Sequence, residues 1–316
     1  MEFTELGSTG LKISRLSLGA WQFSEAWGMK DYGLAKSIVA KALEVGINFI
    51  DTAMIYGRGM SEDFLGRALQ ELGVKRDEVV IATKIPGEFL SPEDVPRAIE
   101  RSLARLRTES IDLLLIHWPP AWHNFPTCTY MRALERAVNV GAVNYLGLSD
   151  YPVELAEAAR ACLAREDLVA LQVRFNLAER WAEAEHIPYA EANGLTLMAW
   201  SPLGKGALTG KYSLEEAGRL QDVRMNEALF HPKNYSQVLE LVNVIREIGN
   251  KYGKTPAQVA LNWLISYSDV IVPIVGARSP SQVEENVGAV GWRLSFEDWR
   301  SLDEASKRLK ITYVTW

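Results

Sequence analysis

The chain has 316 residues, of which 48% are hydrophobic and 23% are charged. These values are ordinary for a folded globular protein and are enough for one large α/β barrel domain over residues 1–316. With 34 basic and 40 acidic residues, the net charge is −6, so we expect neither nucleic acid nor an anionic membrane surface as the main partner.

Targeting signals and cysteine spacing favour a cytoplasmic protein. The first residues, MEFTELGSTGLK, contain no basic start followed by an apolar stretch, and no run approaches the roughly 20 apolar residues of a membrane span. Two cysteines, Cys128 and Cys162, are too few for a disulfide framework, which favours a reducing compartment. No two His, Cys or acidic residues share a recognised ligand spacing, so we predict no metal site.

Strand and helix patterns alternate along the chain. Residues 3–16 predict a β-hairpin around the turn-rich GSTG. Apolar runs then predict eight strands, which end near Gly19, Asp51, Lys84, His117, Ser149, Asn176, Trp200 and Gly276. Helical spacing lies between them at residues 34–46, 61–73, 91–107, 130–140, 152–164 and 182–194. Ser61 and Ser91 are the expected helix starts.

This alternation implies parallel strands with right-handed crossovers. Eight units favour a closed (β/α)8 TIM barrel, with the N-terminal hairpin at its bottom. No G-x-G-x-x-G follows the first strand, which disfavours an open dinucleotide-binding sheet.

The connection between strands 7 and 8 is unusually long. It runs from Trp200 to Val270 and predicts a long loop followed by two extra helices, at residues 233–252 and 256–267. Such a loop is usually functional, and this one follows a strand on the side where barrel enzymes keep their active sites. Residues 295–309 predict a packing helix, and the pattern leaves open whether the final ITYVTW reaches the barrel mouth.

Three ionisable residues end neighbouring strands at one repeated spacing. Asp51, Lys84 and His117 are 33 residues apart in each case, and Tyr56 follows Asp51 by five. A charge at the end of a buried strand is costly unless it is paired or used. Adjacent strand ends converge at one mouth of a parallel barrel, so we predict that the four share one site. Taken alone, Asp51 and Lys84 would fit a structural ion pair at the barrel rim better, and it is the presence of Tyr56 and His117 that favours a functional site.

The four side chains predict proton transfer. A phenol, with a pKa of about 10, is a poor acid at neutral pH, and we expect the Lys84 ammonium to lower the pKa of Tyr56. Asp51 would keep Lys84 charged and in place, and His117 would donate a hydrogen bond to a substrate oxygen. This arrangement suits protonation of a carbonyl oxygen as it becomes an alkoxide. No side chain supplies a hydride, so a nicotinamide cofactor is required.

At these residues the chain resembles the aldo-keto reductase superfamily, over essentially its whole length. The matching motifs are LGSTGLKISRLSLGAW, GINFIDTAMIYGRGMSE, ATK, IDLLLIHWP, GLSDY, QVRFNLAER, WSPLGKGALTGKY and VGARSPSQVEEN. The WSPLGKGALTGKY form is similar to the bacterial and archaeal branches. The resemblance implies NADPH-dependent reduction of aldehydes or ketones, with Tyr56 as proton donor and Lys84, Asp51 and His117 supporting it.

The resemblance also implies where the cofactor binds. Ser149 and Gln172 match the residues that hold the nicotinamide carboxamide, and Trp200 matches the aromatic residue that stacks on its ring. The other implied cofactor positions are Gly19, Ala20 and Trp21 after the first strand, Asp51 and Asp150 beside the nicotinamide, Ser201, Pro202, Leu203, Gly206 and Lys211 across the pyrophosphate, and Gly276, Arg278, Gln282, Glu285 and Asn286 around the adenosine. Since a guanidinium binds phosphate in a fork, Arg278 is the candidate for a 2′-phosphate and favours NADPH over NADH.

Two positions depart from the family pattern. Asp150 stands where the family usually has Asn, and it cannot donate to the carboxamide oxygen as Asn does. Phe175 stands where the family usually has Tyr.

Four tryptophans are candidates for the substrate pocket. Trp21, Trp27, Trp118 and Trp122 would line an apolar pocket, although loop packing explains Trp27 and Trp122 nearly as well. The sequence does not identify the substrate.

Other functions remain open at this stage. One is a nicotinamide-nucleotide-sensing binding module with little catalytic output, which the intact set of four residues disfavours. Another is a barrel lyase in which Lys84 forms a Schiff base, which ranks last because Asp51 would keep Lys84 protonated.

The other three histidines show no functional pattern. His123, His186 and His231 are scattered along the chain, and we expect ordinary surface or packing roles for them. The oligomeric state is also open.

Overall fold

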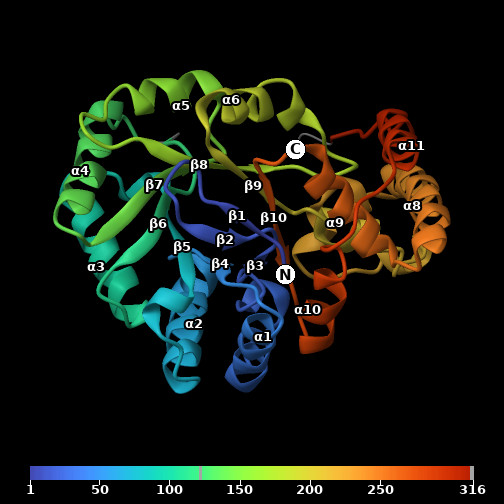
Figure 1. The fold of residues 1–316 in the computed structure, drawn as a ribbon, viewed down its shortest axis with the longest axis horizontal. Helices are drawn as coiled ribbons and strands as arrows, with labels where there is room; N and C mark the ends of the chain where they lie inside the picture. Colours follow the sequence, from blue (N-terminus) through green and yellow to red (C-terminus); the bar gives the residue numbers. More distant parts are fainter. Residues whose placement is uncertain (121–122, 314–316) are drawn as a thin grey trace.

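Parallel strands form the centre of the molecule. The computed structural model describes residues 1–120 and 123–313, and within these ranges eight parallel strands close into a barrel in the order β10-β3-β4-β5-β6-β7-β8-β9 (Figure 1). The barrel strands are β3 (Ser17–Gly19), β4 (Phe49–Asp51), β5 (Val80–Ile85), β6 (Ile111–Ile116), β7 (Val143–Ser149), β8 (Leu168–Arg174), β9 (Thr196–Trp200) and β10 (Ile271–Gly276). The predicted (β/α)8 TIM barrel is confirmed. Each strand ends within two residues of its expected end.

Helices surround this barrel (Figure 1). They are α1 (Tyr32–Glu44), α2 (Met60–Glu71), α3 (Asp94–Leu106), α4 (Thr127–Asn139), α5 (Val153–Arg160), α6 (His186–Asn193), α7 (Leu214–Ala217), α8 (Pro232–Tyr252), α9 (Pro256–Tyr267), α10 (Pro280–Val287) and α11 (Phe296–Lys307). Every residue of β5 and β6 is buried, as expected for parallel strands covered on both faces. Helix α3 buries Val95, Ala98, Ile99 and Leu106, one apolar stripe at helical spacing.

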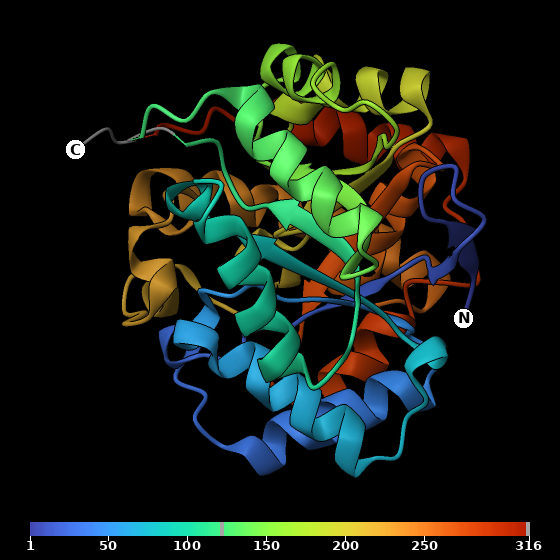
Figure 2. The same cartoon turned by 90° about the vertical axis from the view of Figure 1, so that its left-hand side faces the viewer.

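The N-terminal hairpin closes one end of the barrel. Strands β1 (Phe3–Glu5) and β2 (Lys12–Ser14) pair antiparallel. Leu6 and Ile13 are fully buried in one cluster with Phe49 and other residues of the barrel interior. The backbone N–H of Gly7 donates to the Thr196 hydroxyl at the start of β9 (2.7 Å). The hairpin therefore covers the end at which the strands begin, and Figure 2 shows it on the side opposite to the last described residues.

The long connection after β9 has the expected length and the expected two helices. Its first part, predicted as a loop, contains short helical turns at Gly204–Thr209, Val223–Asn226 and Ala228–Phe230 as well as α7. Helices α8 and α9 follow, and the predicted helix at 295–309 is α11. The C-terminal segment is described only as far as Tyr313, so the end of ITYVTW lies outside the described residues.

Two local predictions were wrong. Helix α2 begins at Met60, with Gly59 as its N-cap, so Ser61 does not cap it. The Ser61 hydroxyl is buried and instead donates to the carbonyl of Ala20 (2.8 Å), which joins the segments that follow β3 and β4. Helix α3 begins at Asp94, three residues later than expected, although the Ser91 hydroxyl accepts from the Asp94 backbone N–H (3.1 Å) as an N-cap side chain does.

The structure also joins the two cysteines. Cys128, at the start of α4, and Cys162, just after α5, form a disulfide with their Cα atoms 4.8 Å apart. Two cysteines suffice for one cross-link, and their separation of 34 residues gave no sign of it. Their number is therefore no argument for a reducing compartment. No helix in the described ranges is long and apolar enough to cross a membrane.

Candidate active site

The ends of three neighbouring strands bring the predicted residues together. Asp51 ends β4, Lys84 is the penultimate residue of β5, and His117 directly follows β6. The Lys84 ammonium, which is fully buried, donates to Asp51 Oδ2 (2.7 Å) and to the Thr52 carbonyl (2.7 Å). It also lies 3.3 Å from the hydroxyl of Tyr56. The rings of Tyr56 and His117 meet edge to face, with centroids 5.5 Å apart, so all four side chains share one site.

The loop after β4 returns Tyr56 to this site. The parallel hydrogen bonding continues past the strand end, since Thr52 N–H donates to the Ala82 carbonyl (2.8 Å) and Met54 N–H to the Lys84 carbonyl (3.3 Å). The chain then turns sharply through Gly57 and Arg58, which both have φ of 58°. A left-handed conformation costs free energy in a non-glycine residue and often occurs at functional sites. Tyr56 directly precedes this turn, and the centre of its ring lies 4.9 Å from the Lys84 ammonium.

Burial decides the protonation state of Tyr56. Desolvation raises the pKa of Tyr56 above its ordinary value of 10.0, although the Lys84 charge lowers it. The predicted lowering of the Tyr56 pKa was therefore wrong, because removing the phenolate from water costs more free energy than its attraction to the Lys84 ammonium regains. Burial also lowers the pKa of Lys84, but Asp51 and Tyr56 more than offset this and raise it above 10.5. At neutral pH the site holds a protonated phenol beside a charged ammonium.

His117 is a neutral imidazole. Burial, and then the nearby Lys84 charge, hold the pKa of His117 well below 6.5. Its Nδ1 atom has no hydrogen-bond partner among residues 1–120 and 123–313, and its ring lies against Trp118 with centroids 4.3 Å apart. A neutral imidazole carries one N–H, and the tautomer decides which nitrogen bears it. His117 can thus donate one hydrogen bond without acting as an acid.

A cavity of about 520 Å³ extends from these residues to α10. It is lined by the positions that the family resemblance assigned to the cofactor, with the exception of Ala20: Gly19, Trp21, Asp51, Ser149, Asp150, Gln172, Trp200, Ser201, Pro202, Leu203, Gly206, Lys211, Gly276, Arg278, Gln282, Glu285 and Asn286. Ala20 instead donates its backbone N–H to the Asp51 carbonyl (2.8 Å). Lys84 does not line the cavity itself, but its ammonium contacts Tyr56 and Asp51, which do.

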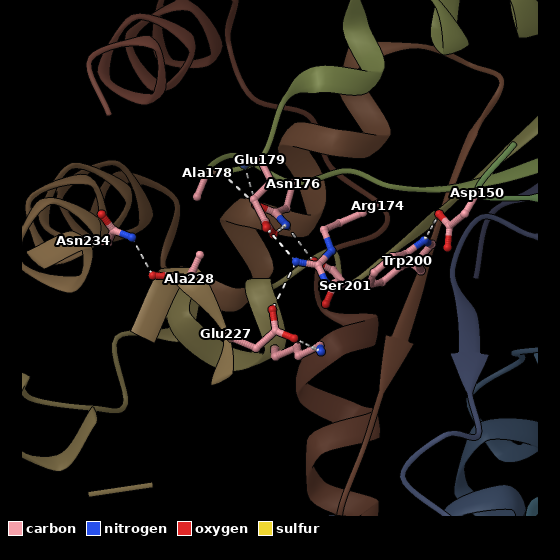
Figure 3. Close-up of polar contacts among 11 residues, drawn as sticks. Asp150, Arg174, Asn176, Ala178, Glu179, Trp200, Ser201, Glu227, Ala228 and Asn234 are labelled. Atoms are coloured by element: carbon pink, nitrogen blue, oxygen red, sulfur yellow. Dashed lines mark hydrogen bonds and ion pairs between the residues drawn. The ribbon is translucent and has the colours of Figure 1, made fainter. Parts of the chain in front are cut away.

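Polar side chains of β7, β8 and β9 form one wall near Asp51 and Tyr56. Ser149 and Gln172 are register partners on β7 and β8. Gln172 Nε2 donates to Asp51 Oδ1 (2.9 Å), which holds Asp51 from the side opposite Lys84. The Trp200 indole N–H donates to Asp150 Oδ1 (2.9 Å; Figure 3). These hydrogen bonds hold the side chains of this wall in place and leave some of their polar atoms available to a ligand.

An ion-pair network joins the end of β8 to the long connection (Figure 3). The Arg174 guanidinium lies 4.4 Å from the centre of the Trp200 ring and pairs with Glu179 (2.8 Å) and Glu227 (3.1 Å). Glu227 also pairs with Lys205, whose ammonium lies 4.8 Å from the Trp21 ring. The segment around Glu227 is therefore tied to β8 through Arg174 and to the cavity residue Lys205.

The departure at Phe175 affects the core rather than the cavity. The Phe175 side chain is fully buried and packs against Trp263 and Tyr267, with ring centroids 5.7 and 5.4 Å away. The next residue, Asn176, donates to Glu179 (2.8 Å) and to the Ser201 carbonyl (3.0 Å). The absent phenol hydroxyl is therefore not a lost cavity contact.

The far end of the cavity carries cations. Lys211, in the long connection, pairs with Glu285 of α10 (3.2 Å), and Asn286 beside it is buried. Arg278 has an exposed side chain just before the N-terminus of α10, where its backbone N–H donates to Gln282 (2.8 Å). An exposed guanidinium at a helix N-terminus suits a phosphate.

Several lining residues were missed by the sequence reasoning. Trp21, Trp27 and Trp118 line the cavity as expected for a substrate pocket, whereas Trp122 lies outside the described residues. The additional lining residues are Gln22, Ala26, Ile55, Gly57, Lys205, Thr209, Tyr212, Arg224, Ala257, Ile274 and Val275. Lys205 lies within the recognised WSPLGKGALTGKY motif, which was a usable signal. Arg224 lies in a stretch without periodicity, which offered none.

The remaining histidines have separate surroundings. His186 Nε2 hydrogen-bonds the Tyr151 carbonyl (2.9 Å), His231 caps α8, and His123 is exposed. Among the described residues, no group of three His, Cys, Asp or Glu side chains could hold a metal ion.

Comparison with known proteins agrees with this geometry. Residues 15–307 match the sequence profile described as "Aldo/keto reductase family". The chain belongs to the aldo/keto reductase family. Family members are NAD(P)H-dependent oxidoreductases, and this reductase is one of them.

Individual relatives cover nearly the whole reductase. It is 31% identical to "Aldo-keto reductase YhdN" of Bacillus subtilis (strain 168), over 96% of this chain and 93% of the relative. It is 35% identical to a "Probable voltage-gated potassium channel subunit beta" of Arabidopsis thaliana, over 92% and 91%. Among solved structures, the glycerol dehydrogenase AKR11B4 from Gluconobacter oxydans matches with a TM-score of 0.88 and 30% identity, covering 99% of this chain and 98% of that chain.

Proposed function

We propose that this reductase uses NADPH to reduce aldehydes or ketones to alcohols, in a reversible reaction for which Tyr56 supplies the proton. The main support is the Tyr56 hydroxyl, which lies 3.3 Å from the Lys84 ammonium and beside the neutral His117, in a cavity that continues to α10. Carbonyl reduction needs a proton donor and a cofactor site in one cavity, and this geometry supports the proposal that both are present.

The residues divide into binding and proton-transfer roles. Ser149 and Gln172 would bind the carboxamide of NADPH, and the Trp200 ring would lie against its nicotinamide. Arg278 would bind the 2′-phosphate and so favour NADPH over NADH. When bound, the cofactor supplies the hydride that no side chain can provide.

The proton moves from the phenol of Tyr56 to the carbonyl oxygen. The raised pKa of Tyr56 keeps the phenol protonated until it is needed, and the Lys84 ammonium at 3.3 Å stabilises the phenolate that remains. His117 donates a hydrogen bond to the same oxygen as negative charge develops there. Asp51 holds Lys84 in place and does not contact the substrate.

The test is cofactor oxidation with a panel of aldehydes and ketones. Wild type is expected to turn over, and Tyr56→Phe to lose activity by roughly 10²- to 10⁴-fold while its dissociation constant for NADPH changes little. Tyr189→Phe is the matched control, because that hydroxyl binds Glu157 on the outer helices (2.5 Å). No turnover by wild type, or full turnover by Tyr56→Phe, would contradict the proposal.

Two alternatives are weaker. The first is a nucleotide-sensing binding module with little catalytic output; one relative is named as a channel subunit beta rather than as an enzyme. Tight NADPH binding without turnover, together with a stable protein partner, would support this alternative. A Schiff-base lyase needs an accessible neutral amine. Lys84 is fully buried, and its ammonium has Asp51, Thr52 and Tyr56 as partners, so borohydride should trap no carbonyl on it.

A further inference from the structure

Asp150 is a cavity carboxylate that the proton transfer does not use. It directly follows β7, has a left-handed φ of 53°, and lines the cavity together with Ser149 and Gln172. Its backbone N–H donates to the Gln172 carbonyl (2.8 Å), and its Oδ1 accepts from the Trp200 indole N–H (2.9 Å; Figure 3). Both contacts fix the carboxylate at the nicotinamide end of the proposed cofactor site.

Cations close to Asp150 are already engaged by other carboxylates. Arg174, on β8, is paired with Glu179 and Glu227, and Lys84, on β5, is paired with Asp51. Asp150 itself forms no salt bridge with any of the described residues. Its hydrogen bond to Trp200 satisfies one oxygen and neutralises no charge.

The charges at this end of the cavity therefore do not cancel. Tyr56 is a neutral phenol and His117 a neutral imidazole. Lys84 and Asp51 cancel each other as a pair at 2.7 Å, so Asp150 adds one uncompensated negative charge. Asparagine is the usual residue at this position in the aldo/keto reductase family, and it would leave this end of the cavity neutral.

We propose that Asp150 is a specificity-determining residue that strengthens binding of the oxidised cofactor, NADP⁺, relative to the reduced cofactor, NADPH. This inference rests on the proposed function, since it requires a nicotinamide cofactor in the cavity. NADP⁺ carries a positive charge on its nicotinamide ring and NADPH does not, whereas the phosphates and adenosine are common to both. A carboxylate at the nicotinamide end therefore acts on the difference between them.

The protonation of Asp150 provides a second, mutation-free test. Burial raises the pKa of Asp150 to about 6, against the lowering effects of the Trp200 hydrogen bond and the Arg174 and Lys84 charges. The Asp150 charge in turn raises the pKa of Tyr56. In the free protein a larger fraction of this carboxylate is therefore ionised near pH 7.5 than near pH 5.5. The preference for NADP⁺ should therefore weaken as the pH falls.

The experiment measures dissociation constants of NADP⁺ and NADPH for the intact protein at both pH values. Asp150→Asn keeps an oxygen for the Trp200 N–H and removes only the charge. We expect it to raise the ratio of the NADP⁺ constant to the NADPH constant about tenfold at pH 7.5, equivalent to about 1.4 kcal/mol. Glu88→Gln is the matched control, because Glu88 also accepts from an indole N–H, that of Trp118 (3.0 Å), but does not line the cavity.

Each outcome has one interpretation. If wild type binds neither cofactor, the proposed function fails. If both bind and the ratio is the same in wild type, Asp150→Asn and Glu88→Gln, the proposed function stands and the role of Asp150 is overturned. If Asp150→Asn does not fold, the wild-type ratio decides: a rise between pH 7.5 and 5.5 supports the role, and a constant ratio overturns it. The 2′-phosphate is common to both cofactors, so its titration cancels in the ratio.

Discussion

Replacing Asp51 by asparagine is expected to destabilise the protein by several kcal/mol. The variant leaves the Lys84 ammonium fully buried, with the Thr52 carbonyl at 2.7 Å and the Tyr56 hydroxyl at 3.3 Å but no anion. Removing one partner of a buried ion pair costs roughly 3–5 kcal/mol. Coulomb attraction between unit charges about 4 Å apart at an effective dielectric constant of about 20 is of similar size, about 4 kcal/mol. Such a loss is a large part of the roughly 5–15 kcal/mol that stabilises a typical domain.

Urea unfolding, followed by circular dichroism, measures this loss. The double variant Asp51→Asn/Lys84→Met removes both charges and should recover most of the stability, because apolar groups often replace a buried ion pair without cost. Equal stability of wild type and Asp51→Asn would refute the reasoning, and so would a double variant less stable than the single one.

The pH dependence gives an independent check. In Asp51→Asn, burial without an anion should depress the pKa of Lys84 below its unfolded value of about 10.4. A depressed lysine pKa reduces stability as the pH falls, so the variant should become more stable from about pH 7 to pH 10. In wild type the pKa of Lys84 is raised, so its contribution persists through this range and is lost only as the pH rises through the folded-state value. The stability difference between the two proteins should therefore shrink as the pH rises.

Three further predictions concern the cofactor site and the cross-link. Arg278→Ala should weaken NADPH binding about tenfold or more while NADH binding changes little, since one charge-assisted phosphate contact is worth about 1.5–3 kcal/mol; equal effects on both dissociation constants would contradict this role. A Cβ atom at Gly276 would lie 2.1 Å from the Gln22 side chain, so Gly276→Ala should push that amide into the cavity and weaken NADPH binding with little change in the urea midpoint; unchanged binding would contradict the close approach. The disulfide closes a loop of 34 residues, so replacing Cys128 and Cys162 by serine should lower the free energy of unfolding by up to about 4 kcal/mol. A reductant should destabilise wild type but not this double variant, and equal sensitivity of the two would contradict the cross-link.

The sequence was a good guide wherever the structural signal is local or strictly periodic. Apolar runs and helical spacing alternate because each strand–helix unit buries its own faces, and this predicted the barrel and its eight strands. The spacing of Asp51, Lys84 and His117 predicted a shared site because parallel strand ends meet at one mouth. The family resemblance then predicted the positions that bind the cofactor, and those positions, apart from Ala20, line one cavity.

Signals that depend on distant parts of the chain were missed. The disulfide requires Cys128 and Cys162 to meet through the packing of α4 and α5. Lys205 and Glu227 pair across a connection that has no regular periodicity, and the role of Ser61 depends on the approach of Ala20. None of these proximities leaves a pattern along the chain.

The pKa of Tyr56 illustrates what the sequence determined and what only the tertiary structure decided. The sequence by itself determined that a phenol, an ammonium, a carboxylate and an imidazole would meet at one barrel mouth, because strand order and strand length place them there. Only the tertiary structure decided how deeply they are buried, and hence that desolvation outweighs the Lys84 charge at Tyr56. It also decided that Asp150 forms no salt bridge within residues 1–120 and 123–313, because Arg174 and Lys84 are paired with other carboxylates. Burial and charge balance are sums over residues from every strand of the barrel, and no local stretch of sequence contains them.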